Sequence, residues 1–210
     1  KQNPYRKEIE IILPRVLSLV DQDFTNKTYG LCDRLFWAWR ISDFPNATNQ
    51  GVVNGLTRLW VNGFWPYETS EKIFVKRINS LMKGASSITR KNGGLEESFP
   101  NEGSYCVTSL IAFDFLVAFD QLKSSKKIKD KKFLNEWEIK INNWVNFLID
   151  KKETHGIITN HLSTTLAALL RWIFLFPNSK NIKDAKKKIF EILDIIYSYQ
   201  NPNEGWYTEY

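Results

Sequence analysis

The sequence predicts an all-α domain in which helical hairpins form an incomplete (α/α) toroid. Apolar residues recur at helical spacing along most of the 210 residues, and no segment alternates as a strand would. Segments that are apolar nearly all round alternate with segments that are apolar on one face and lysine-rich on the other. Glycine-containing loops recur at a constant position in this alternation. We therefore expect inner apolar helices surrounded by amphipathic outer helices, with equivalent loops at one end.

Helix signals divide the chain into successive segments. Residues 5–20 show helical spacing, and Pro14 inside this segment predicts a kink or break. A short helix or turn is expected over 34–40. Longer helices are expected over 45–61, 68–82, 105–122, 130–150, 161–176 and 182–199. The 105–122 and 161–176 segments are apolar nearly all round and should be covered on more than one side, while the lysine-rich segment after each should lie outside them.

Composition and charge narrow the class of protein. A hydrophobic fraction of 43% and eight tryptophans argue against a disordered chain. The net charge of +6 favours anionic partners, either nucleic acid or an acidic polysaccharide or oligosaccharide; no nucleic-acid-binding module is present, and charge alone does not choose between these partners. No apolar stretch looks long and continuous enough to span a membrane. The two cysteines lack metal-binding spacing and are expected to be free, and no metal or cofactor motif is present.

The pair Asn160-His161 stands at the start of an apolar helix. This end of a helix favours anions, and an amide donor beside an imidazole suits a bound carboxylate. The structural alternative is that Asn160 caps the helix and His161 is an ordinary first-turn residue. Position alone leaves both interpretations open.

Acidic side chains in the recurring loops are further candidates. Glu97, Glu102 and Glu209 could form paired catalytic carboxylates, as in glycosidases, or could satisfy loop amides and helix ends. Asp114 lies in an apolar run and is expected to be hydrogen-bonded across helices. No distance between these groups follows from the sequence.

Tyrosines in the same loops could take part in proton transfer. Tyr105, Tyr207 and Tyr210 are candidate proton donors or acceptors, with ordinary packing as the structural alternative. Trp206, beside Tyr207, is a candidate surface for stacking a sugar ring. These residues join the candidate site.

A segment rich in arginine and tryptophan follows the first recurring loop. Arg34, Trp37 and Arg40, with Asp33 and Asp43 nearby, suit carbohydrate binding through stacking and bidentate polar contacts. The alternative is an ordinary Asp33–Arg34 ion pair in an aromatic core. We predict that Arg34, Trp37 and Arg40 contact substrate.

Several short motifs occur in the order in which heparinase II/III-like proteins carry them. They are residues 29–34 with Trp37, residues 43–47, residues 97–105, Asn160-His161 and residues 204–210. Their ordered combination covers most of the chain. On these motifs the chain resembles the heparinase II/III-like family of polysaccharide lyases.

The resemblance implies a fold and an activity. Members have an incomplete (α/α) toroid followed by a β-sandwich, so residues 1–210 would be one toroid domain at the N-terminal side of a longer protein. They cleave uronate-containing polysaccharides by β-elimination. Asn160 and His161 match the family's Asn/His pair, which neutralises the substrate carboxylate while the C5 proton is removed. A tyrosine serves as base or acid.

The resemblance also implies that this chain is an incomplete catalytic unit. The family's tyrosine comes about one loop after the Asn/His pair, near Tyr207 and Tyr210 or beyond them. Its second histidine comes from a later part of the protein, for which His155 is a poor substitute. The family favours a periplasmic or secreted location, although no signal peptide is visible.

Other functions stay open. A non-catalytic glycan-binding domain of a polysaccharide biosynthesis pathway would use Asn160 and His161 for binding alone. A uronate C5-epimerase would abstract the same proton without elimination. A glycosidase would use Glu97 or Glu102 with Glu209 and release products without an unsaturated ring. The oligomeric state does not follow from the sequence.

Overall fold

Helices make up the regular structure of the described chain. The computed structural model describes residues 4–97, 99, 101–125, 127–128 and 130–207. In chain order the helices of this part are α1 (Arg6–Leu17), α2 (Arg34–Trp37), the short 3-10 helix η1 (Thr48–Gly51), α3 (Val52–Val61), α4 (Glu71–Ser87), α5 (Tyr105–Ser125), α6 (Lys131–Asp150), α7 (Thr159–Leu175) and α8 (Ile182–Ser198). Extended backbone pairs there only as isolated bridges, so the predicted all-α class is confirmed.

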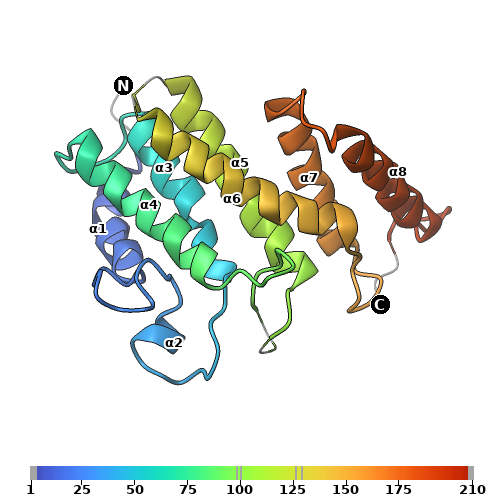
Figure 1. The fold of residues 1–210 in the computed structure, drawn as a ribbon, viewed down its shortest axis with the longest axis horizontal. Coiled ribbons are helices and arrows are strands. Elements are labelled where there is room, and N and C mark those ends of the chain that lie inside the picture. Colours follow the sequence, from blue (N-terminus) through green and yellow to red (C-terminus); the bar gives the residue numbers. More distant parts are fainter. Residues whose placement is uncertain (1–3, 98, 100, 126, 129, 208–210) are drawn as a thin grey trace.

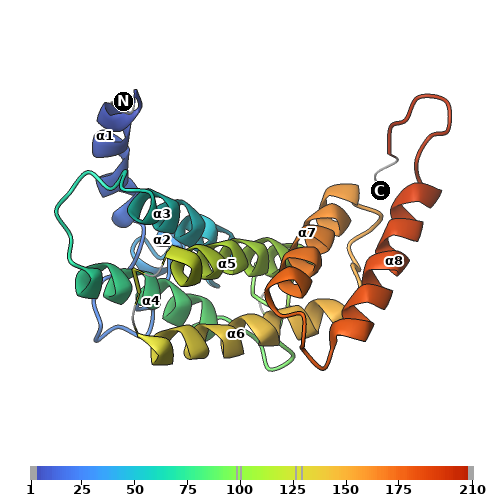
Figure 2. The same cartoon turned by 90° about the horizontal axis from the view of Figure 1, so that it is seen from above.

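The longer helices form two curved layers. Helix α5 packs most extensively against α7, α3 and α6, and α8 packs mainly against α7. Figure 1 shows the elements in order, and Figure 2 shows α3, α5 and α7 as one curved row with α4 and α6 below it. The row is an open arc in these views. The two lysine-rich segments expected outside the apolar helices, α6 and α8, pack against α5 and α7 respectively.

The inner helices are not equally covered. Helix α5 is enclosed by α3, α6 and α7, as its all-round apolar sequence predicts. Helix α7 packs on α5 and α8, but Leu170 and Phe174 are 55% and 70% exposed. Complete burial of the 161–176 segment was thus wrong, because no described helix covers the face of α7 that carries these two side chains.

The composition of helix α5 is also that of a membrane-spanning helix. The helix is long and apolar enough to cross a membrane, contrary to the expectation from the sequence, and 67% of its most apolar window is buried inside the protein. Packing against three neighbouring helices accounts for this composition, because a core helix must be apolar on every covered face.

Helix α4 continues five residues beyond its predicted end. The prediction stopped before Gly84, but this glycine lies inside the helix against the loop that contains Gly30. A Cβ atom at Gly84 would lie 2.2 Å from the carbonyl oxygen of Gly30. The side chain of Gln50, which is fully buried, also donates to the carbonyls of Gly30 and Leu81 at 3.2 and 2.8 Å. Gly84 thus permits close packing and does not end the helix.

The predicted break at Pro14 is absent, since α1 runs from Arg6 to Leu17 with Pro14 inside it. Proline leaves the carbonyl four residues earlier, that of Glu10, without its helical donor. The hydroxyl of Tyr67 donates to this carbonyl at 2.9 Å. A side chain from the α3–α4 connection therefore replaces the missing backbone hydrogen bond.

Removing this hydroxyl should weaken the attachment of α1. Tyr67→Phe is expected to lower the free energy of unfolding by about 0.5–1 kcal/mol, the usual contribution of one partly exposed hydrogen bond. Urea denaturation measures the change, with Tyr197→Phe at an exposed position on α8 as the matched control. Equal effects of the two substitutions would contradict this role of Tyr67.

Asp114 makes the predicted hydrogen bond between helices. Its Oδ1 accepts from the side-chain amide of Asn54 on α3 at 2.8 Å. Burial raises the pKa of Asp114, and the hydrogen bond from Asn54 and the charge of Arg58 oppose this rise. The native chain therefore binds this proton more tightly than the unfolded chain, and stability falls as the pH rises through the interval between the two pKa values.

Asp114→Asn should remove this loss of stability. The variant is expected to exceed the parent in stability at pH 7 and to differ little from it near pH 3, because the parent carboxyl is then protonated in both states. Asp23→Asn is the control, for which the opposite change in stability at pH 7 is expected. Hydrogen bonds from Thr25 lower the pKa of Asp23, so its substitution should reduce stability at pH 7. Thermal unfolding of both variants and the parent at pH 3 and pH 7 checks these expectations. An Asp114→Asn variant less stable than the parent at pH 7 would contradict the effect assigned to burial of the carboxylate.

Tryptophans divide between the core and the surface. Three are fully buried, and each indole N–H donates to a polar side chain: Trp137 to Asn79, Trp144 to Thr89 and Trp172 to Asn142. Trp39 and Trp206 are instead 58% and 74% exposed. Only exposed tryptophans and those that line cavities remain available for ligands.

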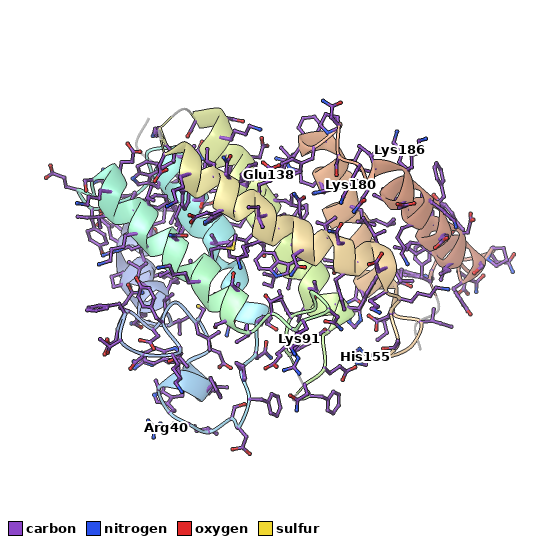
Figure 3. All side chains as sticks on the ribbon, viewed as in Figure 1. Arg40, Lys91, Glu138, His155, Lys180 and Lys186 are labelled. Carbon is purple, nitrogen blue, oxygen red and sulfur yellow. The ribbon has the colours of Figure 1, made fainter. Side chains whose placement is uncertain are left out.

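The loops that carry the candidate residues lie at one end of the molecule. Figure 1 shows α2, the α4–α5 loop and the α6–α7 loop along its lower edge. Figure 3 labels Arg40, Lys91 and His155 on these three segments, at the same end. Of the predicted recurring loops, those that contain Gly94 and Gly156 lie together at this end. We refer to this part of the surface as the loop end.

Candidate functional site

A buried carboxylate joins two histidines at the loop end. The side chain of Glu153, in the α6–α7 loop, is only 3% exposed. Its Oε1 accepts from the backbone N–H groups of Thr154 and His155 at 2.8 and 2.9 Å. Its Oε2 lies 2.8 Å from Nδ1 of His161 in the first turn of α7. Glu153 therefore fixes both the loop and the imidazole of His161.

This contact determines which nitrogen of His161 carries a proton. An ionised carboxylate only accepts hydrogen bonds, so Nδ1 must be the donor to Glu153. In the neutral imidazole the lone pair then lies on Nε2. His161 is one-fifth exposed, and no hydrogen bond to its Nε2 occurs among the described residues. The geometry is that of a carboxylate-oriented general base.

His155 has carboxylates at both nitrogens. Its Nδ1 lies 3.2 Å from Glu153 Oε1, and its Nε2 lies 3.3 Å from Glu102 Oε1. Only the protonated imidazolium can donate to both carboxylates at once. His155 therefore lies between the carboxylates of the α4–α5 and α6–α7 loops, where a positive charge on its imidazole would hold the two loops together.

Asn160 does not cap α7. The N-cap position is Ile158, whose side chain cannot accept a hydrogen bond, and Asn160 lies in the first turn. The Asn160 side chain is exposed, and within the described chain it makes no hydrogen bond. The capping alternative is thus wrong, and the amide is available next to His161 at the positive end of the helix.

Tyr105 lies close to Glu153 but is buried. Burial raises its pKa to about 12, and the charges of Glu153 and Glu191 act in the same direction. Its hydroxyl is 3.4 Å from the carbonyl oxygen of Leu148. Tyr105 also lines a cavity of about 610 Å³ between the α6–α7 loop and α8. Its hydroxyl therefore stays protonated at neutral pH.

In the α2 region, Arg34 and the indole N–H of Trp37 make contacts within the protein. Arg34 lies 5.9 and 5.4 Å from the ring centroids of Trp37 and Trp39, and the indole N–H of Trp37 donates to Leu19. Asp33 caps α2 by accepting from backbone N–H groups, and no Asp33–Arg34 ion pair occurs in the described chain. The predicted ion pair is wrong, because capping and the backbone N–H of Asn46 occupy the carboxylate.

The remaining candidates are not joined to His161 by any described contact. Glu97 accepts from the hydroxyl of Ser104 at 2.6 Å, which is the structural alternative for this carboxylate. Trp206 and Tyr207 lie on an exposed turn after α8. Glu209 and Tyr210 lie outside the described residues.

The structure thus brings together Glu102, His155, Glu153 and His161, with Asn160 adjacent in sequence. Glu153 was missed from the sequence. Its signal was a lone glutamate after two lysines, eight residues before His161, in a chain with only two histidines. That spacing corresponds to no known motif, because the contact depends on the loop turning back toward α7.

Comparison with protein-family models, with curated proteins and with solved structures finds no match to this chain.

Proposed function

We propose that this chain carries the uronate-binding and proton-abstracting part of a polysaccharide lyase site, within an (α/α) toroid-like domain. One observation carries the proposal. The buried carboxylate of Glu153 accepts from Nδ1 of His161 and leaves Nε2 without a described partner, in the first turn of α7, where the exposed amide of Asn160 also lies.

The proposed chemistry uses these groups in separate roles. Nε2 of His161 accepts the C5 proton of a uronate, the electron pair forms the C4–C5 double bond, and the C4–O4 bond breaks. The amide of Asn160 and the N-terminal end of α7 stabilise the negative charge that grows on the uronate carboxylate. A tyrosine of the 204–210 segment would protonate the departing O4.

Charge around the site supports an anionic substrate. Lys151 and Lys152 are exposed directly before Glu153, and Lys91 lies at the loop end (Figure 3). The whole chain carries +6. Such a field raises the local concentration of a polyanion.

The test is turnover of uronate polymers. Alginate and heparan sulfate are each incubated with the chain, with a neutral glucan as control, and absorbance of the unsaturated product is followed. Product from at least one uronate polymer and none from the glucan is expected. A complete lack of unsaturated product, with no hydrogen exchange at C5, would overturn the proposal.

A non-catalytic glycan-binding domain is the second candidate. It is favoured by the burial of Tyr105, which lines the same cavity as Glu153 and whose pKa burial raises to about 12. This candidate predicts that His161→Ala weakens oligosaccharide binding measured by calorimetry, while the parent releases no product.

A further inference from the structure

A polar cavity lies at the loop end, apart from the His161 site. It measures about 410 Å³, and its walls come from the 26–28 turn and the 36–43 segment. This volume falls within the range of small-ligand sites. Phe36 and Trp37 give the cavity aromatic lining, and its other lining residues are polar or charged.

The charged side chains that line this cavity are exposed to solvent at its mouth. Thr28 donates to Asp21 and Ser42 to the carbonyl of Phe44. No hydrogen bond or ion pair is recorded, within the described residues, for the side chains of Lys27, Arg40 or Asp43. By contrast, the cavity beside α8 contains charged groups that already have partners, such as Lys188, which donates to the carbonyl of Lys151 at 2.7 Å.

The backbone at Arg40 gives an independent indication. Its φ is +52°, in the left-handed region that a side chain disfavours. Glycine would adopt this conformation without strain. The chain therefore has an arginine where glycine would make the folded state more stable. Backbone strain of this kind is characteristic of functional sites.

The chemistry of the ligand follows from these groups. Two cations and one carboxylate fit a molecule that carries an anionic group and neighbouring hydroxyls, because cations bind the former and Asp43 accepts from the latter. The aromatic lining suits the apolar face of a sugar ring. Arg40 and His155 lie at the same end of the molecule, with Lys91 between them (Figure 3). One extended polymer could therefore contact both regions.

We propose that this cavity is a remote subsite that binds one acidic sugar residue of the polymer, with Lys27 and Arg40 on its anionic group and Trp37 against its ring. The proposal rests on the proposed function for the class of ligand. It adds a site that positions the polymer and takes no part in bond breaking.

Arg40→Gly separates binding from folding. Because glycine relieves the backbone, the variant should unfold at the same or a higher temperature than the parent. Its affinity for alginate or heparin oligosaccharides should fall about tenfold, as expected for one lost charge-assisted hydrogen bond. Lys186→Gln is the control, since it also removes one positive charge but lies at the opposite end (Figure 3). If both variants lost affinity equally, the loss would come from the lower net charge and not from the cavity, and the proposed subsite would be wrong.

Two readouts keep this proposal distinct from the proposed function. If His161→Ala abolishes turnover while Arg40→Gly binds oligosaccharide as tightly as the parent, the subsite is wrong and the lyase site stands. Nuclear magnetic resonance with free glucuronate tests the cavity directly. Shifts of the Trp37 indole signal that Arg40→Gly removes support the subsite even if no polymer is turned over, and an unchanged signal overturns it.

Discussion

His161→Ala is expected to lower the rate of unsaturated-product formation by about 10²–10⁴-fold, the usual contribution of a positioned general base. The physical reason is the loss of Nε2, the nitrogen that Glu153 leaves unprotonated. Glu153→Gln should lower the rate by a comparable factor, because its amide oxygen must still accept from the backbone N–H groups of Thr154 and His155, so its NH2 group faces Nδ1 and the proton of the imidazole moves to Nε2. Initial rates at saturating polymer measure both.

The chain offers a matched control, since it has two histidines and both contact Glu153. His155 has carboxylates at both nitrogens, so His155→Ala should leave the rate within a few-fold of the parent. Circular dichroism confirms that all variants keep their helices. Equal losses in the two histidine variants would show that the histidines only hold the loops together.

Gly84→Ala should have the largest effect on stability, lowering the free energy of unfolding by at least about 2–3 kcal/mol, as overpacking does. The added Cβ would lie 2.2 Å from the carbonyl oxygen of Gly30 and 2.6 Å from the backbone nitrogen of Leu31. Neither is a flexible side chain that can move aside. Helix α4 and the first loop must therefore separate, which also disturbs the attachment of that loop through Gln50.

Gly55→Ala on α3 is the opposite case. Nothing lies within 4 Å of a Cβ at this position, so alanine should stabilise the helix by about 0.5–1 kcal/mol. Urea denaturation of both variants gives the comparison. A Gly84→Ala variant as stable as the parent would contradict the close approach of Gly30 to α4.

The sequence predicted the helices because their apolar spacing is a local property. The apolar 105–122 segment is the core helix α5, and the lysine-rich segments α6 and α8 pack against α5 and α7 respectively. The errors came from contacts distant in sequence. Pro14 did not break α1 because Tyr67 replaces the lost donor, and Gly84 did not end α4 because it contacts Gly30.

The candidate site was harder to predict than the fold. The sequence located Asn160-His161 at the start of α7 and Glu102 in a neighbouring loop. It missed Glu153, whose burial arises from the path of the α6–α7 loop. The sequence also predicted that Arg34 contacts substrate, whereas in the structure its guanidinium lies over the rings of Trp37 and Trp39. Residue type suggests chemistry, but only the fold determines which groups remain free.

Hydrogen exchange at C5 of a uronate oligosaccharide is the most direct test of the central claim, that His161 is a base held by Glu153 for proton abstraction. The chain is incubated with the oligosaccharide in D₂O, and mass spectrometry measures deuterium in recovered substrate while absorbance measures unsaturated product. The account predicts deuterium at C5, unsaturated product or both with the parent, and neither with His161→Ala. Neither signal with the parent, or equal signals from the parent and His161→Ala, would contradict it.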